Sequence, residues 1–291
     1  MHHVNVVAPP EAIVRFLTNG RKPLDLFHWE RFAVNGTVLP VHGKITVRKQ
    51  DDWTEKDPKV LAMYHVERDG SLTEVKFESI WGVSTENNPE QAHLLHDLLR
   101  DDIRIVTVDG KAGTGKNFVV LVACLYMSHK LNRSLVYMRE DQKVGRDPGA
   151  LPGDAAEKNS GTLHPFWDTL NKIPDLPFQD MGQIEEFVSF TPVWELRGRT
   201  FDDTFLIYDE AQNSDVDVLK TFGTRAGKRT KVILLGSHNQ IDNAKARKSF
   251  SRLIDAFTAS ADAHGHYAHS HLVIRKRGLV ARLFEDVLEF V

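Results

Sequence analysis

Apolar positions follow two different patterns along the chain, and the first extends to about residue 85. In this part, short apolar runs are separated by turn dipeptides, and Asp69-Gly70 lies between two segments with a strand pattern, as expected for a hairpin. We predict a small β-rich segment over residues 1–85. Its predicted elements are a helix at Glu11–Leu17 and strands at Phe32–Val34, Gly43–Val47, Val60–Val66 and Thr73–Phe77.

From residue 86 onward, compact apolar runs alternate with stretches in which apolar residues recur at helical spacing. This alternation is typical of an α/β domain in which a mostly parallel sheet is covered by helices on both faces, so we predict one domain over residues 86–291. The predicted strands are Ile103–Val108, Ser134–Met138, Phe187–Phe190, Thr204–Tyr208, Lys231–Leu235 and His271–Ile274. The predicted helices are Pro89–Leu99, Phe118–Lys130, His164–Lys172, Asp215–Thr224, Ala246–Ala259 and Leu279–Phe290.

A glycine-rich loop joins the first of these strands to a helix. Three glycines allow its backbone amides to converge on phosphate groups, the helix N-terminus adds partial positive charge, and Lys116 adds a mobile cation. Because strand, loop, lysine and helix occur in the required order, we predict a nucleotide-binding phosphate loop. Its residues are Gly110, Lys111, Ala112, Gly113, Thr114, Gly115 and Lys116.

The residue after this lysine is Asn117, where such loops usually carry a Ser or Thr whose hydroxyl binds Mg²⁺. An amide oxygen is also a ligand for Mg²⁺, but it reaches further, and the amide NH₂ group is repelled by the metal. We therefore expect triphosphate binding to be retained and hydrolysis to be slowed.

Two acids, Asp209 and Glu210, follow the apolar strand Thr204–Tyr208. Adjacent acids are common on surface turns, but beside a phosphate loop they indicate a metal ligand and a base. Asp209 would then hold Mg²⁺ through a water molecule, and Glu210 would orient and deprotonate the attacking water.

Gln240 follows the strand Lys231–Leu235, at the edge of a parallel sheet where ligands bind. It is a candidate for contact with the γ-phosphate or the attacking water. From its position alone, an ordinary loop residue is an equal alternative.

From Trp81 to the C-terminus, the chain resembles the PhoH-like ATPases, a branch of P-loop proteins related to superfamily 1 helicases. The resemblance rests on several motifs in the family's order. They are Trp81-Gly82-Val83, Asn88 to Gln91, Gly110 to Lys116, Gly149 to Gly153, Arg197 to Thr200, Asp209 to Asn213, Arg225, Gly236 to Asp242 and Arg277.

The resemblance implies a RecA-like fold that binds ATP and Mg²⁺ and is coupled to RNA or single-stranded DNA. It also implies that Gln91 contacts the adenine. A single ATPase core acting as a motor needs a neighbouring subunit, so a ring-shaped homo-oligomer such as a hexamer is expected, with Arg199 or Arg277 donated across the interface. The chain departs from the family at Asn117 and at Ser237, where the family usually has an Asp.

Three functions fit these residues. The first is a nucleic-acid-coupled ATPase with helicase-like properties, and the second is an ATP-binding switch with little or no turnover, which Asn117 and Ser237 favour. The third is a small-molecule kinase, against which the motifs Arg197–Thr200 and Asp209–Asn213 argue.

Composition adds little to this prediction. The 291 residues carry a net charge of −3, but residues 219–291 contain 13 Lys/Arg against 6 Asp/Glu. These basic residues could neutralise phosphates, although solvated helix faces and loops are the favoured interpretation of any one cluster. The single cysteine, Cys124, excludes an internal disulfide and fits a reducing cytoplasm. With no apolar run long enough to span a bilayer and no secretory pattern at Met1, we expect a cytoplasmic protein without membrane contact.

Overall fold

The fold is described from a computed structural model. It describes residues 3–8, 42–49, 60–139, 166–237 and 248–275, apart from positions 70, 179, 197, 261 and 264. The predicted elements Glu11–Leu17, Phe32–Val34 and Leu279–Phe290 lie outside these residues.

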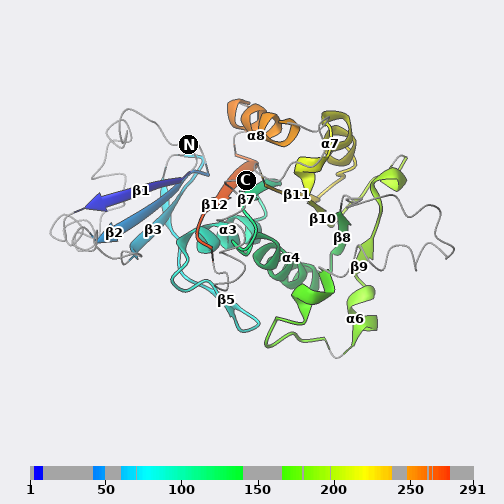
Figure 1. Ribbon diagram of the computed structural model, residues 1–291, viewed down its shortest axis with the longest axis horizontal. Helices are drawn as coiled ribbons and strands as arrows, with labels where there is room; N and C mark the ends of the chain where they lie inside the picture. The colour runs from blue at the N-terminus through cyan, green and yellow to red at the C-terminus, as the bar shows by residue number, and fades with distance from the viewer. Residues whose placement is uncertain are drawn as a thin grey trace, which may run out of the picture.

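A parallel sheet of six strands forms the centre of the molecule, in the order β12-β7-β11-β10-β8-β9 (Figure 1). Every neighbouring pair within it is parallel. All residues of the two central strands β10 and β11 are buried, which explains why their sequences are apolar without alternation. The bounds are β7 Ile105–Gly110, β8 Ser134–Arg139, β9 Val188–Phe190, β10 Thr204–Asp209, β11 Lys231–Gly236 and β12 Tyr267–Leu272.

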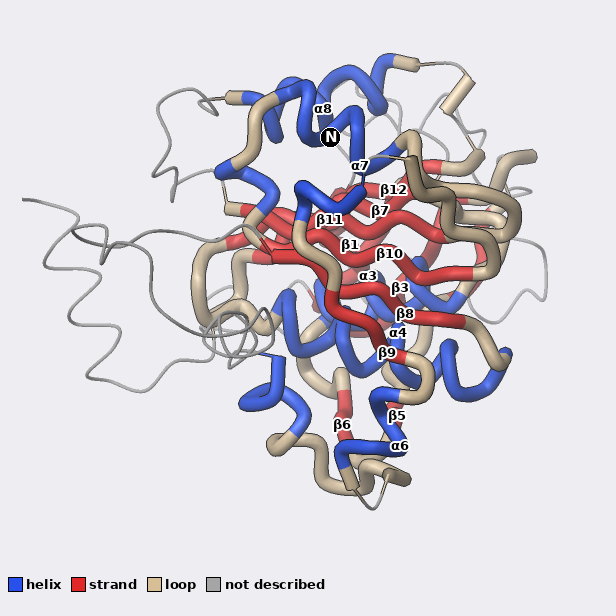
Figure 2. The backbone as a smooth tube through the Cα atoms, turned by 90° about the vertical axis from the view of Figure 1, so that its right-hand side faces the viewer, coloured by secondary structure: helices blue, strands red, loops and turns tan. Residues whose placement is uncertain are grey.

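Helices cover both faces of this sheet, as predicted (Figure 2). The helices α3 (Pro89–Leu99) and α4 (Lys116–Leu131) pack on one face, and α7 (Val216–Gly223) and α8 (Ser249–Ala259) pack on the other. The helix α4 is buried on most of its surface because it packs against both the sheet and the neighbouring α3, and burial raises the pKa of Cys124 within it to about 12. The fold class predicted from the sequence is therefore confirmed.

Shorter elements complete the described part of this domain. Residues 166–170 are helical, within the predicted helix His164–Lys172. The remaining elements are α6 (Met181–Glu185), the 3₁₀ helices η3 (Val193–Leu196) and η4 (Ala211–Asn213), and the two-stranded pair β5 (Ser79–Ile80) and β6 (Val83–Ser84).

The N-terminal part forms a separate four-stranded sheet in the order β1-β2-β3-β4. Its strands are β1 (His3–Ala8), β2 (Lys44–Lys49), β3 (Val60–Val66) and β4 (Leu72–Glu74). The predicted hairpin is confirmed, since β3 and β4 pair antiparallel through Tyr64 and Glu74. Strand β1, which pairs parallel with β2, was not predicted.

The predicted strand His271–Ile274 is wrong in position, because β12 occupies Tyr267–Leu272. The strand therefore begins four residues earlier than predicted, and its polar side chains are buried beside β7 apart from the exposed His271. There the Thr107 hydroxyl lies 2.7 Å from the Tyr267 hydroxyl and 2.8 Å from Nδ1 of His269. Polar side chains that satisfy one another in this way are tolerated inside a sheet.

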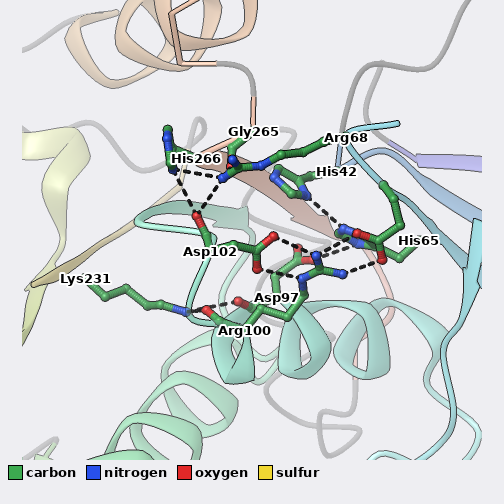
Figure 3. Close-up of polar contacts among 10 residues, drawn as sticks. His42, His65, Arg68, Asp97, Arg100, Asp102, Lys231, Gly265 and His266 are labelled. Carbon is green, nitrogen blue, oxygen red and sulfur yellow. Dashed lines mark hydrogen bonds and ion pairs between the residues drawn. The ribbon is translucent and has the colours of Figure 1, made fainter. Parts of the chain in front are cut away.

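The buried carboxylate of Asp97 on α3 joins the two sheets. It forms an ion pair with Lys44 of β2 at 2.7 Å, and its Oδ1 atom lies 3.3 Å from Nδ1 of His65 on β3. A second imidazole, that of His42, is hydrogen bonded to His65 at 2.8 Å (Figure 3). The opposite charge of Lys44 and the hydrogen bond from His65 outweigh burial, so the pKa of Asp97 lies below its usual range.

A second buried cation holds the end of the same helix. The ammonium group of Lys231, at the start of β11, donates to the carbonyl oxygens of Asp97, Leu98 and Arg100 at 2.5 to 3.1 Å (Figure 3). A cation at this position compensates the partial negative charge of a helix C-terminus. Burial lowers the pKa of Lys231 to about 8.

Among the described residues, no helix is long and apolar enough to cross a membrane.

We predict that Asp97→Asn lowers the free energy of unfolding by about 3–5 kcal/mol, because it leaves the Lys44 ammonium buried without its counter-charge. Urea denaturation measures the loss. Asp101→Asn is the matched control, since Asp101 is 55% exposed and pairs with Arg133 at the surface, where such a pair contributes less than about 1 kcal/mol. Equal losses in the two variants would contradict the role assigned to Asp97.

Candidate functional site

The phosphate loop lies at the carboxyl end of the central sheet, between β7 and α4. Gly113 and Gly115 both have a φ of 82°, which a residue with a side chain adopts only at a cost. Gly115 caps the N-terminus of α4, and Lys116 is the first residue of that helix. The chain therefore curls immediately before a helix N-terminus, which is an arrangement suited to binding a phosphate.

The side chains of the loop are held close to its backbone. Nζ of Lys116 donates to the carbonyl oxygen of Gly110 at 3.0 Å, and the Thr114 hydroxyl donates to the carbonyl oxygen of Lys111 at 2.9 Å. At Gly110 a Cβ atom would lie 2.8 Å from the carbonyl oxygen of Leu272 on β12. Glycine is thus required there for a strand to pack against the start of the loop.

Gln91 contacts the phosphate loop from helix α3. The side chain of Asn88 caps this helix by accepting from the backbone amide of Gln91 at 3.1 Å. Gln91 then donates through Nε2 to the carbonyl oxygen of Thr114 at 2.9 Å. The contact places Gln91 beside the loop, and its role in binding adenine stays a prediction.

The carboxylate of Asp209, at the end of β10, is fully buried and accepts hydrogen bonds from the side chains of three residues on two other elements. Its Oδ2 atom accepts from Asn117 of α4 at 2.8 Å, and from the Tyr137 hydroxyl and Arg139 of β8 at 2.6 and 2.7 Å. Asn117 must direct its NH₂ group toward the carboxylate, because an ionised carboxylate only accepts. The helix that follows the phosphate loop and the acidic strand end are therefore in direct contact.

Glu210 follows in an uncommon backbone conformation, with a φ of 59°. A left-handed backbone at a residue with a side chain costs about 1–3 kcal/mol and is found often at functional sites. Its carboxylate accepts from Gln212 Nε2 at 2.6 Å and from Arg139 at 3.3 Å. The Gln212 carbonyl in turn accepts from the backbone amide of Ser237, after β11, at 3.1 Å.

Asn117 and Asp209 are the residues predicted to hold a divalent metal ion, and their role as ligands stays a prediction. Oδ2 of the buried Asp209 carboxylate accepts hydrogen bonds from three donors, one of them the guanidinium of Arg139. This position therefore attracts positive charge. An amide and a carboxylate at this point are suitable ligands for Mg²⁺.

A polar cavity of about 340 Å³ opens beside the loop. Three cations border it, which suits a polyanion such as a triphosphate. Its lining residues are Ala112, Gly113, Gly115, Lys116, Asn117, Phe118, Arg139, Thr169, Lys172 and Glu210.

A larger and mostly apolar hollow of about 970 Å³ lies between α7 and α8. It shares no lining residue with the cavity beside the loop. Neither a residue of the glycine-rich loop nor Glu210 lines the larger hollow, so the smaller cavity is the candidate nucleotide site.

Other predicted residues are not gathered at this cavity. Arg199 is exposed, and its guanidinium lies 4.8 Å from the ring centre of Phe201. Its backbone carbonyl accepts from Arg225 at 3.4 Å. Gln240 and Arg277 lie outside the described residues, so their predicted roles stay predictions.

Sequence analysis did not identify Tyr137, Arg139 and Gln212 as parts of the site. The signal for Arg139 is its position at the end of an apolar strand, because parallel strands end at the same edge of a sheet. Arg139 and Asp209 lie opposite each other in the register of β8 and β10. This pairing can be predicted only when β8 and β10 are known to be neighbouring strands.

Comparison with known proteins agrees with this geometry. The family model for the PhoH-like protein matches residues 84–286. This chain belongs to the PhoH-like family. The resemblance inferred from its motifs is therefore confirmed.

Relatives of this PhoH-like chain include two bacterial proteins named PhoH2. The Bacillus subtilis protein is 38% identical over 177 residues, which cover 57% of this chain and 39% of the relative. The Mycolicibacterium smegmatis protein is 32% identical over 203 residues, which cover 69% of this chain and 46% of the relative. The matched region thus spans less than half the length of each relative.

Among solved structures, the Pif1 helicase of Candida albicans matches with a TM-score of 0.35 and 19% identity. The match covers 69% of this chain and 42% of that helicase.

We predict that Gly115→Ala weakens nucleotide binding by at least about tenfold in this PhoH-like chain, an effect of about 1.4 kcal/mol. A Cβ at Gly115 would lie 2.5 Å from Nε2 of Gln91 and would displace that side chain from the loop. Fluorescence titration with a labelled ADP measures the affinity.

Gly198→Ala is the matched control for this variant. Gly198 has a φ of 80°, but a Cβ there would meet no atom within 4 Å. Both variants should therefore lose about 1 kcal/mol of stability from the left-handed backbone. Only Gly115→Ala should lose affinity, and equal affinity in both would contradict the assignment of the loop.

Proposed function

We propose that this chain binds ATP and hydrolyses it in the presence of Mg²⁺, at the cavity beside residues 110–116. One observation carries the proposal. The Asn117 amide, directly after the loop lysine, lies 2.8 Å from the Asp209 carboxylate, although 92 positions separate them in sequence. A phosphate-binding loop and an acidic pair in contact are the two parts that ATP hydrolysis requires.

Each part of the cavity has a role in this proposal. The loop amides and Lys116 bind the β- and γ-phosphates, and the strained Glu210 orients and deprotonates the attacking water. Asn117 and Asp209 would hold Mg²⁺, which when bound neutralises negative charge on the phosphates. Gln91 is proposed to contact the adenine from its position beside the loop.

Coupling to RNA or single-stranded DNA is the second part of the proposal. It is supported by Lys220 on α7, by Arg229 in the following turn and by Arg252 on α8, which are exposed around the hollow between these helices. Cations arranged along one surface attract a phosphate backbone. Assembly into a ring would give each site an arginine from its neighbour, with Arg199 as the described candidate.

The division of the chain belongs to the same proposal. Residues 86–291 would form the ATPase domain, and residues 1–85 would form an appended β-rich unit. The two separate sheets support this division.

An ATP-binding switch with little turnover is the second candidate function. Asn117 in place of a hydroxyl residue favours it. Ser237 favours it as well, because its buried hydroxyl has no hydrogen-bond partner among the described residues. The contact of Arg139 with both acids adds a positive charge where Mg²⁺ would bind.

ATP turnover by the purified chain with Mg²⁺ decides between these candidates. We expect turnover in the natural chain and a loss of at least about a hundredfold in Lys116→Ala and in Glu210→Gln, since each removes a group that acts in the transition state. Lys228→Ala, at an exposed turn, is the control and should leave turnover unchanged. If the natural chain binds ATP yet turns over no faster than Lys116→Ala, the switch is favoured.

Stimulation of ATP turnover by single-stranded RNA tests the proposed coupling to nucleic acid. Because Arg252 is exposed and lines the hollow between α7 and α8 but not the cavity beside the loop, Arg252→Glu should leave basal turnover unchanged and weaken RNA stimulation by about tenfold at low salt. Asp255→Lys, one turn further along α8, is the charge-reversed control and should not weaken it. RNA stimulation that Arg252→Glu leaves unchanged would exclude this surface.

A further inference from the structure

Arg139 connects the two acids of the proposed ATPase site. It is the last residue of β8 and the register partner of Asp209 on β10. Its guanidinium lies 2.7 Å from Oδ2 of Asp209 and 3.3 Å from Oε1 of Glu210. Arg139 thus contacts both Asp209, the proposed metal ligand, and Glu210, the proposed base for the attacking water.

The guanidinium stays charged in this position. Burial alone would lower the pKa of Arg139, but the charge of Asp209, followed by Tyr137 and Glu210, keeps it above its usual value. Burial and then the charge of Asp209 raise the pKa of the Tyr137 hydroxyl, so this group keeps its proton and donates it. The Oδ2 atom of Asp209 therefore accepts from two neutral donors and one positively charged donor.

The oxygen Oδ2 of Asp209 has no further capacity. A carboxylate oxygen has about two lone-pair sites, and three donors already point at this one. The other oxygen, Oδ1, accepts from the backbone amide of Glu210 at 2.9 Å. A cation that binds Oδ2 must therefore displace one of the three donors.

Arg139 is the donor best placed to leave. Tyr137 is buried, with its ring 5.2 Å from that of Phe166, and Asn117 is fixed in the first turn of α4. The Arg139 side chain is 23% exposed and borders the cavity beside the loop. A guanidinium is also repelled by a divalent cation at the same oxygen, whereas neutral donors are repelled much less.

We propose that Arg139 is an internal counter-ion which competes with the divalent cation for Asp209, and which moves toward the phosphates in the same cavity when that cation binds. This inference rests on the proposed function of the site. Arg139 is then a positioning residue that lowers the dependence of nucleotide binding on metal. Without metal, the Arg139 guanidinium shields the phosphates from the carboxylates of Asp209 and Glu210. A metal ion that binds Oδ2 of Asp209 displaces the guanidinium from that oxygen.

The affinity for a fluorescently labelled ADP, measured once in Mg²⁺ and once in EDTA, tests this inference. The ratio of the two dissociation constants is the coupling between metal and nucleotide. We expect Arg139→Gln to increase this coupling by at least about tenfold, because a charge-assisted hydrogen bond is removed from the metal's ligand. Arg139→Lys keeps a cation and should stay within about threefold of the natural chain.

Arg133→Gln is the matched control, since Arg133 lies just before the opposite end of β8 and pairs with Asp101. Thermal unfolding measures whether each variant is folded. If Arg139→Gln does not fold, the coupling measured in Arg139→Lys still tests the inference. A coupling in Arg139→Gln equal to that in Arg133→Gln, or an equal increase in Arg139→Lys, would overturn the inference. A natural chain that binds no ADP in either solution would instead overturn the proposed function.

Discussion

The negative charge of one buried carboxylate, that of Asp209, determines how the carboxyl edge of the central sheet is arranged. A buried anion is tolerated only if donors or cations surround it. Here they come from the helix after the phosphate loop and from a neighbouring strand. The contacts that stabilise Asp209 are therefore the same contacts that bring the loop, the acids and Arg139 together around one cavity.

A second buried carboxylate, that of Asp97, connects helix α3 to the N-terminal sheet. Its partners Lys44 and His65 are themselves buried, and they belong to the N-terminal sheet. No donor of Asp97 borders the cavity beside the phosphate loop. One acid thus holds two sheets together, while the other is hydrogen bonded to Asn117 and Arg139, which line the cavity beside the loop.

Much of the fold could be predicted because the central strands are buried on both faces, so that their sequences are continuous apolar runs. Strand β12 was misplaced because its burial depends on hydrogen bonds among Thr107, Tyr267 and His269, which a hydropathy pattern does not contain. Strand β1 was missed because six residues that pair with a distant strand give only a weak local signal.

The candidate site divides in the same way. The loop and the acidic pair are local motifs, so their residues could be named from the sequence alone. Arg139 and Gln212 act through neighbours that belong to other strands or loops, and their contacts depend on which strands lie side by side. Contacts of this kind follow from the topology of the sheet rather than from the spacing of residues.

A crystal structure with Mn²⁺ and a non-hydrolysable ATP analogue tests the central claim most directly, because the anomalous signal of manganese locates the metal. The account predicts phosphates along residues 110–116, manganese beside Asn117 and Asp209, and Arg139 no longer bonded to Asp209. An analogue bound elsewhere, for example in the hollow between α7 and α8, would contradict the account.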